Sequence, residues 1–74
     1  MTKRQRIEKF LIGNNYVCYS PGFWEKHWDG GRREQRVRIK QKTVIITDIE
    51  HPIFTEGWSE ETKSFDDFLE EYKI

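Results

Sequence analysis

Cys18 and His27 are the residues whose side chains could act together as a nucleophile and a base. A thiol becomes an effective nucleophile when a base within hydrogen-bond reach accepts its proton. The two residues fall on different predicted strands, and no sequence feature brings them into contact. We therefore interpret Cys18 as a structural cysteine, and we expect no enzymatic activity.

Histidine and carboxylate side chains could also bind a metal ion, and the candidates are His27 and His51 with Asp29, Asp48 and Glu50. Zinc sites usually combine Cys-x₂₋₄-Cys or His-x₃₋₅-His pairs, and calcium loops are compact, acidic and bent at a glycine. The chain has neither pattern. We expect no metal site and no cofactor, and we interpret His51 as a loop residue.

The adjacent pair Gly30-Gly31 follows Asp29 and is the chain's most glycine-rich point. Phosphate-binding loops need GxxxxGK[ST] or GxGxxG, and neither is present. Asp-Gly-Gly is instead typical of a hairpin turn, because glycine adopts positive φ without strain.

A basic and aromatic segment surrounds this turn. We predict that its outward side chains form a partner-binding surface, which comprises Trp24, Trp28, Arg32, Arg33, Arg36, Arg38 and Lys40. Tryptophan and arginine are enriched in protein interfaces. The same residues, with Tyr16 and Tyr19, could also bind single-stranded nucleic acid, which needs a positive groove and rings on which bases stack. Both hypotheses stay open, and Phe23 is assigned to the core.

The carboxylate pairs near the C-terminus are Asp66, Asp67, Glu70 and Glu71. They lie opposite the apolar stripe of a predicted helix, so they form either a solvated face or an acidic docking face for a basic partner.

Formal charge is zero overall but is unevenly distributed. Residues 1–42 hold eleven basic and four acidic side chains, a balance of +7, and residues 43–74 hold two and nine, a balance of −7. Packing decides whether this sequence dipole is also a dipole in space.

Two helices are predicted, over 3–12 and 65–73. Thr2 and Gln5 form a capping box, and Gly13 is placed to end the first helix in a left-handed conformation. Ser64 caps the second helix, where four apolar residues follow helical spacing.

Strands are predicted over 16–19, 23–28, 33–40 and 43–49. Residues 20–22 read Ser-Pro-Gly, which is typical of a type II turn. Trp24 and Trp28 share one face with Lys26, and since neither face of this strand is clearly apolar, we interpret 23–28 as an edge strand. The segment 43–49 is the expected central strand, and Ile53-Phe54 is expected at an edge or in a loop after Pro52.

The fold class is therefore α+β, a single domain over residues 1–74 in the order α-β-β-β(-β)-α. It has an antiparallel sheet of three or four strands, with the N- and C-terminal helices on one face and Arg36, Arg38 and Lys40 on the other. A 74-residue chain buries only about 60% of its unfolded surface, so its core must be small.

The expected function is that of a small non-enzymatic binding protein that regulates or inhibits a protein partner, in the manner of bacteriophage or mobile-element accessory proteins. The alternative is nucleic-acid binding by the Arg/Trp-rich hairpin. We expect a cytoplasmic location, because Cys18 is the single cysteine and no signal peptide is evident. The longest aliphatic run, Val44–Ile46, predicts no membrane association. The protein is expected to be a monomer or an edge-strand homodimer.

Overall fold

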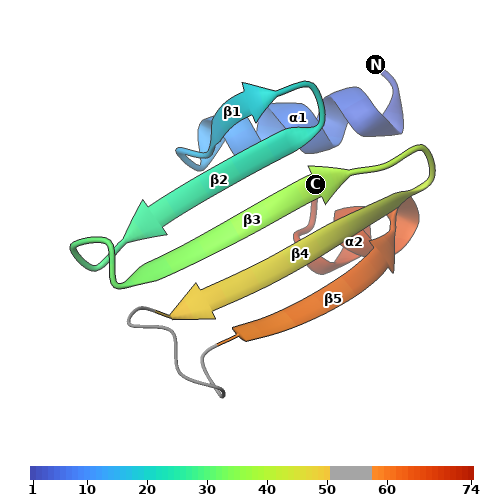
Figure 1. Cartoon of the computed structure of the whole chain (residues 1–74). Coiled ribbons are helices and arrows are strands. Elements are labelled where there is room, and N and C mark those ends of the chain that lie inside the picture. The colour runs from blue at the N-terminus through green and yellow to red at the C-terminus, as the bar shows by residue number, and fades with distance from the viewer. Residues whose placement is uncertain (51–57) are drawn as a thin grey trace.

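The computed structural model of the chain describes residues 1–50 and 58–74. Its elements, in chain order, are α1 (Lys3–Gly13), β1 (Val17–Ser20), β2 (Phe23–Trp28), β3 (Arg33–Ile39), β4 (Thr43–Glu50), β5 (Trp58–Ser64) and α2 (Phe65–Glu71). The five strands form one antiparallel sheet in the order β1-β2-β3-β4-β5. Both helices pack on the same side of this sheet, behind it in Figure 1. The predicted α+β class is confirmed.

Helix α1 begins as its sequence predicts. The Thr2 side chain accepts a hydrogen bond from the Gln5 backbone at 3.1 Å, and the Gln5 side chain accepts one from the Thr2 backbone at 2.8 Å. These bonds satisfy two backbone donors that a helix start leaves unpaired. The left-handed residue after the helix is Asn15, with φ of 66°, and not Gly13 as predicted.

Helix α2 is two residues shorter than predicted. Ser64 caps it, accepting a hydrogen bond from the Asp67 backbone at 3.1 Å. Tyr72 forms the C-cap, and Lys73 then turns the chain with φ of 54°. The aromatic ring of Phe68 packs against those of Phe10 and Tyr72, with centroids 6.0 and 4.6 Å apart, so the two helices share one aromatic cluster.

The predicted turns are present. Gly22 adopts φ of 79°, and its carbonyl accepts a hydrogen bond from Ile39 at 2.8 Å. Asp29, Gly30 and Gly31 all adopt positive φ in the β2–β3 turn. These conformations explain why glycines occur at both turns.

The core fills only one half of the helix-covered face. It consists of Ile7, Leu11, Trp24, Val37, Ile39, Val44, Ile46, Phe68 and Leu69. Along β2 the side chains on this face change from Trp24, which is 4% exposed, to Trp28, which is 37% exposed. Along β4 they change from buried Val44 and Ile46 to exposed Asp48. The half nearest the β3–β4 turn is therefore packed, and the half nearest the β2–β3 turn is not.

Three predictions about the sheet are wrong. The strand over 23–28 is internal, because β1 pairs with its outer side and β3 with its inner side. The central strand is β3, and the strand predicted to be central, β4, lies beside the edge strand β5. Within residues 1–50 and 58–74 the sheet has five strands and not the predicted three or four, because residues 58–64 form the additional strand β5. Ile53 and Phe54 lie outside the described residues.

Neither helix within residues 1–50 and 58–74 has the length and apolar character needed to cross a membrane.

Candidate functional site

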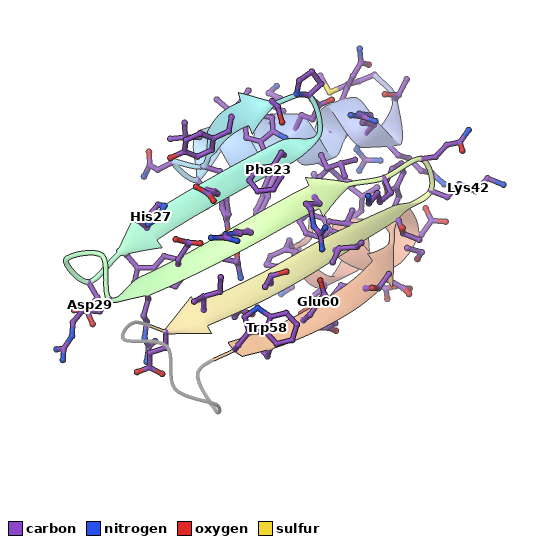
Figure 2. The ribbon with its side chains drawn as sticks, in the orientation of Figure 1. Phe23, His27, Asp29, Lys42, Trp58 and Glu60 are labelled. Carbon is purple, nitrogen blue, oxygen red and sulfur yellow. The ribbon has the colours of Figure 1, made fainter. Side chains whose placement is uncertain are left out.

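The side of the sheet opposite the helices is the candidate site, and we call it the open face. Strand alternation and the pairing register of β2 to β5 assign it these residues: Phe23, Glu25, His27, Glu34, Arg36, Arg38, Thr43, Ile45, Thr47, Ile49, Trp58, Glu60, Thr62 and Ser64. No helix among the described elements covers this side, and it faces the reader in Figure 2. Its composition is mixed, with aromatic rings, paired charges and aliphatic side chains.

A charge network occupies the open face across β2 and β3. The Arg36 Nε atom lies 3.1 Å from Glu25 Oε1 and 2.5 Å from Glu34 Oε2. The two nitrogens of the His27 ring face the same two carboxylates, with Nε2 at 3.4 Å from Glu25 Oε2 and Nδ1 at 3.5 Å from Glu34 Oε1. Glu34 is only 6% exposed, so this network contains a buried carboxylate that is ion-paired.

A second ion pair crosses the other half of the open face. Arg38 donates to Glu60 Oε1 at 2.8 Å, and the Thr47 hydroxyl lies 3.4 Å from the same oxygen. Phe23 and Trp58 stand on either side of these groups (Figure 2). Together with Arg36 they line a depression of about 190 Å³. Trp58 is 53% exposed, which leaves much of its indole ring available for contact.

Trp24 and Trp28 were both predicted to contact a partner, and for Trp24 this prediction is wrong. It is a core residue, because it lies under the helices beside Val37 and is almost fully buried. Phe23, which was predicted to lie in the core, is next to Trp24 on the strand and therefore lies on the open face, where it is partly exposed. The prediction for Phe23 is also wrong. Trp28 is exposed as predicted, but on the helix side of the sheet.

The predicted basic residues do not form one surface. Arg36 and Arg38 lie on the open face and are paired with carboxylates. Arg33 is exposed, but strand alternation places it on the opposite side of β3. Arg32 and Lys40 are exposed at the two ends of β3, and neither makes an ion pair within the described parts of the chain.

The acidic face of α2 is exposed as predicted, but it is partly neutralised. Lys3 binds Asp66 with a 2.7 Å contact, and Lys63 contacts Glu71. Hydrogen bonds to Glu61 and Glu71 raise the pKa of Lys63 above its ordinary value. The Lys3–Asp66 and Arg38–Glu60 pairs each join the basic half of the sequence to the acidic half, so the fold brings the two halves together in space.

A second depression, of about 350 Å³, lies on the unpacked half of the helix side. Tyr16, Lys26, Trp28, Gln35 and Tyr72 line it. The Lys26 ammonium group lies 5.4 Å from the Tyr16 ring centroid and 6.0 Å from that of Trp28, which are cation–π distances. The Tyr16 hydroxyl donates to Gln35, and burial raises the pKa of Tyr16 to about 12.

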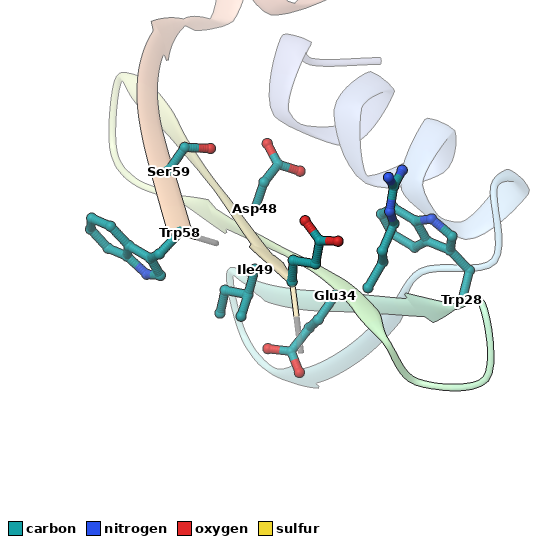
Figure 3. A pocket seen from close by; sticks show the side chains of 8 residues that line it. Trp28, Glu34, Asp48, Ile49, Trp58 and Ser59 are labelled. Carbon is teal, nitrogen blue, oxygen red and sulfur yellow. The ribbon is translucent and has the colours of Figure 1, made fainter. Parts of the chain in front are cut away.

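A third depression, of about 270 Å³, lies at the end of the strands next to the β2–β3 turn. Figure 3 shows that Trp28 and Asp48 project to the helix side of the sheet there, and Glu34 and Ile49 project to the open face. Trp58 and Ser59 close it on the β5 side. This depression wraps around the sheet end and does not belong to one face.

The candidate catalytic pair is not assembled. Cys18 is exposed on β1 opposite Trp24, and its thiol lies 3.1 Å from the Ser20 carbonyl. His27 lies three residues beyond Trp24 on β2, about 10 Å along the strand, and on the opposite face.

Sequence reasoning missed Trp58 and Glu60, because they belong to the unpredicted strand β5. It also missed the convergence of Glu25, His27 and Glu34, which depends on the pairing of β2 with β3. The spacing Glu25-x-His27 is a local signal, because residues two apart on a strand share a face.

Comparison with protein-family models, with curated proteins and with solved structures gave no match.

Proposed function

We propose that this chain is a non-enzymatic binding domain that regulates or inhibits a protein partner by contact through its open face. The observation that carries the proposal is the pair of aromatic rings, Phe23 and Trp58, beside Arg36 and Arg38 on a side of the sheet that no described helix covers. A few residues supply most of the binding energy in protein interfaces, and tryptophan, tyrosine and arginine are enriched among them.

The two arginines are held in place before any partner arrives. Arg36 contacts two carboxylates, and Arg38 contacts Glu60. Immobilising a long side chain on binding costs about 0.5–1.5 kcal/mol, so side chains that are already ordered reduce that cost. Both side chains remain partly exposed, Arg36 at 43% and Arg38 at 39%, and an arginine side chain can stack on a partner's aromatic rings.

A protein partner fits this face better than a nucleic acid does. Phosphate binding draws its affinity from uncompensated positive charge, and the open-face arginines are each paired with a carboxylate. Arg33 points to the other side of β3, and the burial of Trp24 removes one of the two tryptophans on which bases would stack. The features support contact with a surface that itself presents apolar and mixed charged groups.

The test is capture of the partner from nuclease-treated lysate of cells that naturally produce the protein, with variants of the open face and of α2. We expect Trp58→Ala to weaken binding about 30-fold, since a central aromatic contributes roughly 2 kcal/mol or more. Arg38→Glu should weaken it further by placing like charges against Glu60. The matched control is Glu70→Gln on α2, which should bind as the wild type does.

Two results would contradict the proposal. A partner lost on nuclease treatment, with affinity that falls steeply with salt, would favour the nucleic-acid alternative. A partner lost with Glu70→Gln and Asp67→Asn but retained by Trp58→Ala would place the contact on the acidic face of α2. Circular dichroism of each variant excludes unfolding as the cause.

A further inference from the structure

Glu25, His27 and Glu34 converge on one spot of the open face. Glu25 and His27 are two residues apart on β2 and therefore share a face, and Glu34 on β3 is the direct cross-strand partner of His27. One potential ligand atom from each of the three lies within 4.8 Å of the others. Two carboxylates and an imidazole are ligand types that zinc accepts.

The spacing of these atoms is somewhat wider than that of zinc ligands, and side-chain rotation can close it. Zinc binds nitrogen and oxygen at about 2.0–2.1 Å, so two ligands in tetrahedral geometry are separated by roughly 3.4 Å. His27 Nε2 lies 3.4 Å from Glu25 Oε2 and His27 Nδ1 lies 3.5 Å from Glu34 Oε1, so each carboxylate faces a different ring nitrogen. When one ligand atom is taken from each residue, the three atoms lie within 4.8 Å of one another, so zinc binding needs a small inward movement of the side chains. A single ion would use one of the two nitrogens, and a rotation of the His27 ring would bring that nitrogen toward both carboxylates.

In each of the two carboxylates, one oxygen faces His27 and the other oxygen contacts Arg36. Arg36 lies beside Glu25 Oε1 and Glu34 Oε2, and His27 faces Glu25 Oε2 and Glu34 Oε1. Carboxylates that bind metals are commonly hydrogen-bonded through their second oxygen, which fixes the orientation of the first. Arg36 is therefore in the position of such an orienting residue, and the oxygens on the histidine side are Glu25 Oε2 and Glu34 Oε1.

Charge and access are also suited to a divalent cation. Two carboxylates and one guanidinium meet in a cluster whose Glu34 side chain is 6% exposed. The His27 side chain is 45% exposed, so an ion can enter from the solvent. We propose that Glu25, His27 and Glu34 bind one Zn²⁺ ion, with Arg36 as the orienting residue and a fourth coordination position open to water.

The experiment is a zinc titration of the purified protein, made without a histidine tag and treated with chelator beforehand. Isothermal titration calorimetry at neutral pH should give one Zn²⁺ per chain. His27→Ala and Glu25→Gln should each weaken the affinity at least 10-fold, since each removes one ligand. The control is Glu70→Gln, which removes an exposed carboxylate on α2, outside the open face, and should leave the affinity unchanged.

Replacement of Zn²⁺ by Co²⁺ adds a direct readout, because four-coordinate Co²⁺ gives visible absorption bands that the His27→Ala variant should lack. Absence of Zn²⁺ binding by the wild type at 100 µM ion would overturn the proposal, and so would equal affinity of the wild type and His27→Ala. In either case the cluster is an ion-pair network only. The titration needs no partner, so its result is independent of the proposed protein-binding function.

Discussion

Replacing Trp24 with alanine should destabilise the protein by about 4 kcal/mol. Trp24 is 4% exposed and packs in the core beside Val37. A buried tryptophan removes roughly 150–250 Å² from water, and Trp→Ala substitutions in cores typically cost about 3–5 kcal/mol. A domain of 74 residues has a total stability of about 4–11 kcal/mol, so the variant should be marginally folded or unfolded.

The indole nitrogen of Trp24 provides a second, sharper comparison. This atom is buried and has no hydrogen-bond partner within the described residues. An unsatisfied buried donor costs about 1–3 kcal/mol, and phenylalanine removes the donor while keeping a ring. Trp24→Phe should therefore cost less than half as much as Trp24→Ala. Urea unfolding followed by far-ultraviolet circular dichroism measures both variants without depending on tryptophan fluorescence.

Trp58→Ala is the matched control, because Trp58 is 53% exposed on the edge strand. Its free energy of unfolding should stay within about 1 kcal/mol of the wild type. The assignment of Trp24 to the core would be refuted if Trp24→Ala lost less than 1 kcal/mol, or if the two alanine variants were equally destabilised.

Three further predictions concern a turn, a tyrosine and an ion pair. Gly22→Ala should lower the free energy of unfolding in urea by about 2 kcal/mol, because the residue has φ of 79° and a Cβ there would lie 2.9 Å from the carbonyl oxygen of Ile39 on β3. Gly30→Ala is the control, because Gly30 also has positive φ but open space around it, and it should cost about 1 kcal/mol. Burial raises the pKa of Tyr16 to about 12, so the folded state retains a proton that the unfolded state loses near pH 10. Stability should therefore fall as pH rises from 10 to 12, and this fall should be smaller in Tyr16→Phe; equal falls in both proteins would contradict the assignment. A double-mutant cycle on Arg38 and Glu60, both partly exposed, should give a coupling of about 0.2–1 kcal/mol, and a value near zero would contradict a stabilising role for this pair.

Both helices could be predicted from the sequence because their signals are local. Thr2 with Gln5, and Ser64 with the acidic first turn, identify helix starts within four residues. The Asp29-Gly30-Gly31 turn is equally local, because it depends on positive φ at the glycines.

The edge strand β5 could not be predicted, because its sequence, WSEETKS, has no apolar alternation. It pairs with β4 along its length and is exposed at every position but one, so backbone hydrogen bonding and not side-chain burial defines it. Polar, charged side chains are common on edge strands, where they discourage pairing with other chains.

Trp24 was misassigned because the helix side of β2 changes character along its length. Lys26 and Trp28 share a face with Trp24, and this mixture suggested exposure. The helices cover the end of β2 that holds Trp24 and leave the other end open, so one face contains both core and surface residues. Strand periodicity identifies a face but does not show how far along it the covering helices extend.

The open-face site was only partly predictable. Arg36 and Arg38 were placed correctly on the uncovered side by alternation within β3. Their carboxylate partners come from β2 and β5, and the sequence alone does not specify that register.

The most direct measurement of the central claim is photo-crosslinking from the open face in cells that naturally produce the protein. A photoreactive side chain at Thr62, exposed on the open face two residues beyond Glu60, should give a crosslinked product that resists nuclease and is removed by protease. The same group at Glu70 on α2 should give no product. A crosslink that forms only from position 70, or one that disappears on nuclease treatment, would contradict the proposal that this face of the sheet binds a protein.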